Sequence, residues 1–185
     1  MLIIISTGSS VSGQRISFGT WAGSNSISIQ GITDNGALNF GNLYPGVSKS
    51  ITLSSNDAAV FEITAETGYD LTVSMISPSA LTGPGTKTIP FHLSFAYSNQ
   101  GMLNVTAAKT SATEVSSGMT SVTFPLRKYT SGLPAPPPNP LDGNNPVRMT
   151  AKAYLFIYGS IGPVASDASA GVYTGTVNIT VEYAQ

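Results

Sequence analysis

The chain has 185 residues, of which only 9% are charged, against about 25% in an ordinary globular domain. Its 8 Lys and Arg residues are balanced by 9 Asp and Glu, so it lacks the positive charge with which proteins neutralise nucleic-acid phosphates. It has no cysteine and one histidine, His92, which excludes disulfides, thiolate metal sites and most histidine-based catalytic clusters. We therefore expect one domain without enzymatic activity, cofactor, metal or nucleic-acid partner.

The first 22 residues form an apolar N-terminal extension to a domain expected over residues 23–185. The extension carries one charge, Arg15, and is too apolar to stay in water as a solvated tail. Its run of residues 2–5 is too short for a membrane span or a signal-peptide core. We expect burial of its large apolar residues, which are Leu2, Ile3, Ile4, Ile5, Val11, Ile16, Phe18 and Trp21.

Alternation of apolar and polar residues dominates the rest of the chain, whereas no stretch of a dozen residues keeps a helical period. Such alternation predicts an all-β fold, a two-layer sandwich with no helix longer than a turn or two. The strands are predicted at residues 26–32, 48–53, 59–65, 70–76, 91–97, 121–126, 151–157 and 175–183. The apolar rows expected to form the core are Phe61, Ile63 and Ala65; Leu71, Val73 and Met75; Phe91, Leu93, Phe95 and Tyr97; and Val177, Ile179, Val181 and Tyr183.

Residues 129–146 are rich in proline, which removes backbone donors and cannot occupy a central strand. Predicted strands lie on both sides, and those that follow are too few for a second domain. We therefore predict a long surface loop, either a plain spacer or a segment with a functional contact.

Three segments together resemble a known family. They are LNFGNLYPG at residues 38–46, AVFEITAETGYDLTVSM at 59–75 and AGVYTGTVNITVEY at 170–183. Over residues 26–185 the chain resembles the secreted pilin-like domains related to spore coat protein U and, more distantly, the chaperone-usher pilins. The resemblance implies an incomplete immunoglobulin-like sandwich outside the cell, completed by a donor strand from a neighbouring subunit. The chain lacks the first-strand cysteine of the usual pilin and its partner.

The residues of these motifs also have physical roles of their own. Phe40 is expected to fill the end of the sandwich, and Gly41 to adopt a positive φ beside it. Tyr173 is expected to bury its ring and direct its hydroxyl to a backbone carbonyl. Gly175 and Tyr183 belong to the same segment, residues 170–183. We assign structural roles to all five of these residues, Phe40, Gly41, Tyr173, Gly175 and Tyr183.

The extension has two alternative positions. In cis, it adds a strand to its own sandwich; in trans, it pairs with an exposed sheet edge of another copy. Burial of five large apolar side chains is worth about 7 to 15 kcal/mol, comparable to the association cost of about 4 to 15 kcal/mol. With backbone pairing added, this comparison modestly favours the trans arrangement, and a head-to-tail contact that does not close builds a filament.

Other chemistry has weaker support in the sequence. His92 alternates with apolar neighbours and is expected to point outward without a catalytic partner. Lys152 is expected to be an exposed lysine on an edge strand. Asn104 and Asn178 begin glycosylation patterns that occur often by chance, and Asn178 is expected to face outward.

The leading hypothesis is a structural subunit of a cell-surface, pilus-like filament assembled by donor-strand exchange. Candidate partners are other copies of itself, a periplasmic chaperone and an outer-membrane usher, and host or neighbouring cell surfaces in adhesion. The alternative is a monomeric secreted module that binds carbohydrate or a surface through the proline-rich loop or through exposed aromatics such as Tyr44 and Tyr129. A viral capsid or tail protein is third.

Overall fold

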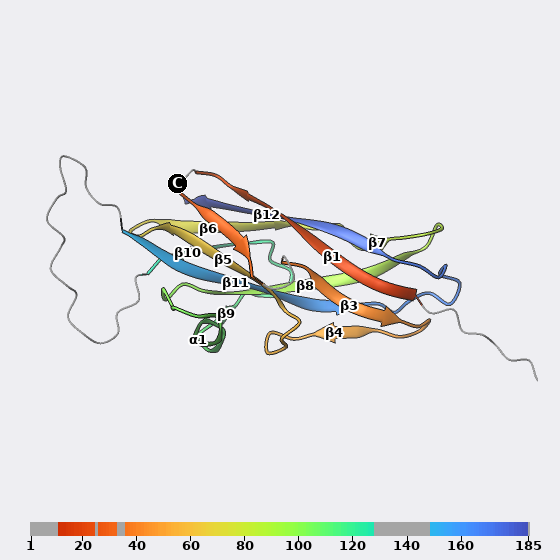
Figure 1. Ribbon diagram of the computed structural model, residues 1–185. Helices are drawn as coiled ribbons and strands as arrows, with labels where there is room; N and C mark the ends of the chain where they lie inside the picture. The colour runs from red at the N-terminus through yellow and green to blue at the C-terminus, as the bar shows by residue number, and fades with distance from the viewer. Residues whose placement is uncertain (1–10, 25, 33–35, 128–148, 185) are drawn as a thin grey trace, which may run out of the picture.

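The computed structural model of the protein describes residues 11–24, 26–32, 36–127 and 149–184. Within these ranges the chain forms twelve strands and one short helix (Figure 1). The elements are β1 (Val11–Ala22), β2 (Ser28–Gly31), β3 (Leu38–Leu43), β4 (Lys49–Ile51), β5 (Ala59–Glu66), β6 (Asp70–Ile76), β7 (Ala80–Thr82), β8 (Thr88–Ser98), α1 (Val105–Thr110), β9 (Thr113–Glu114), β10 (Ser121–Pro125), β11 (Thr150–Ile161) and β12 (Thr174–Tyr183).

The all-β prediction is confirmed. Each of the eight predicted strands corresponds to an observed strand, namely β2, β4, β5, β6, β8, β10, β11 and β12. The one described helix has six residues, within the predicted limit, and no described helix has the length and apolar character required to cross a membrane. The proline-rich segment 129–146 lies outside the described residues.

The strands form a mixed sheet that curls on itself. One half has the order β3-β1-β12-β6-β10, and the other has the order β2-β5-β11-β8-β9. Strand β7 joins the two halves, because it pairs with β12 and with the first residues of β8, while the rest of β8 pairs with β11. Among the strand pairs of the described residues, only β1 and β12 run parallel.

The two halves face each other across an apolar core. The ring of Phe18 on β1 meets the edge of Phe61 on β5 at a centroid distance of 5.4 Å, and Tyr97 on β8 stacks on Phe124 of β10 at 4.3 Å. The apolar rows predicted for the core are all buried except Leu93, Tyr97 and Tyr183, which are partly buried and pack against it. The alternation in the sequence therefore predicted correctly which face of each of these strands points into the core.

A second, smaller cluster lies on the outer face of β5, β8 and β11. It consists of Val60, Ala96, Ala108, Tyr154 and Phe156. Helix α1 contributes Ala108 and covers this face, on the side of the molecule away from β12 and β6 (Figure 1). Strand β11 is consequently buried on both faces over much of its length, which explains its nearly continuous apolar sequence.

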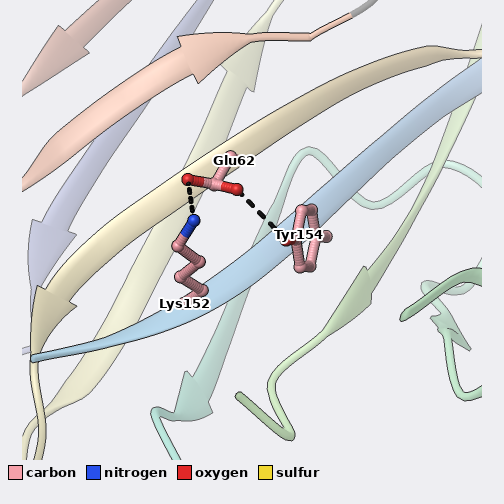
Figure 2. Close-up of polar contacts among 3 residues, drawn as sticks. All are labelled: Glu62, Lys152 and Tyr154. Atoms are coloured by element: carbon pink, nitrogen blue, oxygen red, sulfur yellow. Dashed lines mark hydrogen bonds and ion pairs between the residues drawn. The ribbon is translucent and has the colours of Figure 1, made fainter. Parts of the chain in front are cut away.

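Lys152 is exposed, as predicted, but strand β11 is not an edge strand, which corrects the other part of the expectation. Strand β11 has β5 on one side and β8 on the other. Figure 2 shows Glu62 of β5 reaching two side chains of β11: the Lys152 ammonium lies 2.7 Å from one carboxylate oxygen, and the Tyr154 hydroxyl donates to the other at 3.1 Å. Burial, with the Glu62 carboxylate, raises the pKa of Tyr154 to about 12.

Candidate functional site: the N-terminal strand

Strand β1 occupies a position between two strands that are remote from it in sequence. Its residues 15–22 pair in parallel with residues 174–181 of β12, and its other edge pairs with β3, from Val11 opposite Leu43 to Ile16 opposite Leu38 (Figure 1). In the single chain, residues 11–22 therefore adopt the cis arrangement. This corrects the expectation that an isolated chain leaves this strand position empty, because β1 is here an integral strand of the domain.

The structure separates the apolar residues of the extension by their environment. Ile16 is completely buried, and Phe18 is partly buried against Phe61. Trp21 lies on the outer face with 58% of its surface exposed, so it is not a core residue. Val11 begins β1, whereas Leu2, Ile3, Ile4 and Ile5 lie outside the described residues.

Strand β1 changes its register with β3 near Gly13. Gly13 has a φ of +75°, and the pairing with β3 shifts between Val11 and Gln14. A positive φ is readily adopted by glycine alone, so Gly13 allows the strand to bend before its main paired segment.

Gln14 is the unexpected residue of β1. Its side chain is fully buried, and neither its amide oxygen nor its amide nitrogen has a hydrogen-bond partner among the described residues. A buried polar group without a partner costs about 1–3 kcal/mol. Alternation is the signal in the sequence that could identify Gln14, since it shares the parity of Ile16 and Phe18 and therefore lies on the same face of the strand.

The structural motif residues surround the first half of β1. Gly41 of β3, with a φ of +66°, lies opposite Gln14, and its neighbour Phe40 is completely buried, as predicted for both. Gly175 lies opposite Ile16 on β12. The carbonyl of Tyr173 accepts a hydrogen bond from the Arg15 amide at 3.1 Å.

The prediction for Tyr173 is confirmed in detail. Its ring is completely buried, and its hydroxyl donates to the carbonyl of Ser169 at 3.0 Å. A Cβ on Gly83 would lie 2.6 Å from this ring, so only glycine fits against it. The tyrosine thereby fixes the turn that leads into β12 at the point where β1 joins it.

Tyr183 lies at the other end of β1, beside the link to β2. Its hydroxyl accepts a hydrogen bond from the Glu66 amide and lies 3.0 Å from the hydroxyl of Ser26 in the link. The link itself is short, and Gly23 donates to the Val181 carbonyl at 2.8 Å. A hollow of about 460 Å³ lies beside the link and is lined by residues of the link, by residues 182–184, and by Glu66 and Tyr69.

A second candidate site was missed by the sequence analysis. An open groove of about 780 Å³ lies on the outer face of the sheet between β4 and α1, and the outward-pointing His92, as predicted, contributes to its lining. The residues that line this groove come from five elements, so no local sequence motif predicts the groove. Among the described residues no three His, Asp or Glu side chains gather as a metal site would require.

The chain matches no protein-family model, and a search of curated proteins finds no match.

Proposed function

We propose that the protein is a structural, non-catalytic subunit of an extracellular, pilus-like filament in which β1 of one subunit pairs between β3 and β12 of the next. The observation that carries this proposal is the position of β1. It is an N-terminal strand that fills a slot between two distant strands and is joined to the domain by a short link. The resemblance of residues 26–185 to pilin-like domains supports the same role.

In this proposal the two halves of the curled sheet correspond to the two layers of a pilin-like, immunoglobulin-like sandwich. Withdrawal of β1 exposes the inward residues of its two neighbours, Leu38, Phe40 and Leu43 on β3 and Val177 and Ile179 on β12. The β1 strand of another subunit restores the same contacts. Each subunit then gives one strand and receives one, which builds an open head-to-tail chain.

The free energy of assembly does not come from strand pairing, because the pairing is the same in cis and in trans. It comes from new contacts between neighbouring subunits, whose sparse charge offers little repulsion. Gln14 raises the rate at which β1 leaves the sheet, because its amide regains hydrogen bonds with water when the strand is released. A chaperone that occupies the vacated slot, an usher and a bound cell surface are partners consistent with this scheme.

The absence of native cysteines makes a direct test available. Ser17 and Thr176 are register partners on β1 and β12, so the double variant Ser17→Cys/Thr176→Cys locks β1 in cis when oxidised. We expect filaments of the full chain in negative-stain electron microscopy, no filaments of the oxidised variant, and recovery on reduction.

The matched control is Ser74→Cys/Ser121→Cys, which joins β6 to β10 and leaves β1 free. This control is expected to form filaments when oxidised. Filaments of the oxidised β1 lock would contradict strand exchange. A wild-type chain that remains monomeric would favour the monomeric surface-binding alternative. Labelling of intact cells with an antibody to the protein tests the extracellular location.

A further inference from the structure

The outer groove has a floor and three walls. The floor is formed by β11 and β8, where Ser160 lies opposite His92 and Tyr158 lies opposite Ser94. Only glycine fits at position 159, because a Cβ there would collide with the backbone carbonyl of His92 on β8. The walls are the β4 side, the α1 side and the end of β9, which contribute Ser50–Ser54, Thr106, Lys109, Thr110 and Glu114.

The groove contains one positive and one negative side chain, and both already have partners within the protein. The Lys109 ammonium donates to the Ser55 carbonyl at 2.7 Å, so this cation is already engaged by the protein. Glu114 is exposed and keeps its carboxylate beside the Tyr158 hydroxyl. Because Glu114 balances Lys109 in the lining, the groove has no net positive charge of the kind that phosphate, sulfate or an acidic polymer requires.

The remaining lining combines serine and threonine hydroxyl groups with the apolar side chains of Ile51 and Leu53. Serine and threonine hydroxyls both donate and accept hydrogen bonds, and a carboxylate accepts several. The ring of Tyr158 is partly buried between the main core and the smaller outer cluster, which holds it rigidly in the floor. An aromatic ring among donors and acceptors suits a ligand with an apolar face and a rim of hydroxyls.

We propose that this groove binds a short neutral saccharide. Sugar hydroxyls would pair with Glu114, His92 and the serine and threonine hydroxyls, and a sugar C–H face would lie on the Tyr158 ring. The volume lies within the range of about 300–1,000 Å³ typical of small-molecule sites. None of the lining residues belongs to β1, β3 or β12, so the groove is separate from the strand-exchange site, and its test does not depend on assembly.

The test uses the full chain and four soluble probes: maltotriose, cellotriose, mannotriose and triacetylchitotriose. We expect at least one of them to bind, with NMR shifts concentrated on the groove-lining residues. Glu114→Ala and His92→Ala each alter an exposed side chain and are expected to weaken binding by about tenfold or more. Tyr158→Phe keeps the ring and is expected to lose only a few-fold.

Controls distinguish the groove from the rest of the surface. Glu182→Ala removes the same type of side chain as Glu114→Ala, at an exposed position outside the groove, and should leave the affinity unchanged. Circular dichroism confirms the fold of each variant. The proposal is overturned if no trisaccharide binds at about 10 mM, if the groove variants bind like the wild type, or if inorganic phosphate or heparin binds in preference to every neutral probe.

Discussion

Strands β1 and β12 lie side by side and run in parallel, yet the sheet holds them by different means. On β12 the inward positions Val177, Ile179 and Val181 are all buried and apolar. On β1 the corresponding row contains a buried amide at Gln14, one fully buried apolar residue at Ile16 and a half-buried Phe18. Side-chain burial therefore anchors β12, whereas β1 depends more on backbone pairing, and such a strand is the better candidate for exchange.

The largest expected effect comes from a charge placed at Ile16, a fully buried apolar position of β1. Ile16→Asp should lower the free energy of unfolding by about 4 kcal/mol or more, because a carboxylate is forced into an apolar core. Ser17→Asp, one residue further along β1, is the control and should cost far less. Urea unfolding measures both, and equal losses would mean that β1 is not seated as described.

The second prediction compares core truncations on the two strands. Ile179→Ala on β12 should cost about 2–5 kcal/mol, whereas Phe18→Ala on β1 should cost about 1–2 kcal/mol because its side chain is only partly buried. Denaturant unfolding of the two variants gives the difference. A larger loss for Phe18→Ala would reverse the ranking of the two strands.

The third prediction concerns the buried amide. Gln14→Leu should raise the free energy of unfolding by about 1–3 kcal/mol, since it removes a buried polar group without a partner. Hydrogen exchange of the β1 amides should slow in this variant, and filament growth should slow with it. Gln30→Leu, at an exposed position of β2, is the control and should change stability by less than about 0.5 kcal/mol. A destabilised Gln14→Leu variant would show that the amide is satisfied in solution.

The smallest expected effect concerns Tyr154 on β11, in the half of the sheet that does not contain β1 and β12. It shows how a residue far from these two strands contributes to stability. The pKa of Tyr154 is raised to about 12, so the neutral hydroxyl stabilises the fold fully below pH 10, and this contribution is lost as the pH rises toward 12. Tyr154→Phe should flatten the alkaline loss of stability. Thermal unfolding from pH 8 to pH 12 checks this, and an unchanged profile would contradict it.

Much of the fold follows from local alternation, and the rest depends on partners that are distant in sequence. The eight predicted strands each keep an apolar face within their own residues, and the roles of Phe40, Gly41 and Tyr173 follow from conformations that their residue types favour. Helix α1 was not predicted because six residues are too few for a periodic signal.

The position of β1 could not be decided from sequence for a different reason. Its partner β12 begins more than 150 residues later, and parallel pairing leaves no hairpin signal between two strands. The bend at Gly13 also divides its apolar residues between two registers. The groove escaped prediction because its lining comes from β4, β8, α1, β9 and β11, which meet only in the folded chain.

The most direct measurement of strand exchange mixes two single-cysteine chains. One carries Ser17→Cys on β1 and the other Thr176→Cys on β12, positions that lie opposite each other in the parallel pair. After assembly and oxidation, exchange predicts disulfide-linked dimers of one chain of each kind on a non-reducing gel. A mixture of Ser17→Cys with Thr123→Cys, an exposed position on β10, should give none. Filaments that form without the Ser17–Thr176 cross-link would contradict the exchange of β1 between subunits.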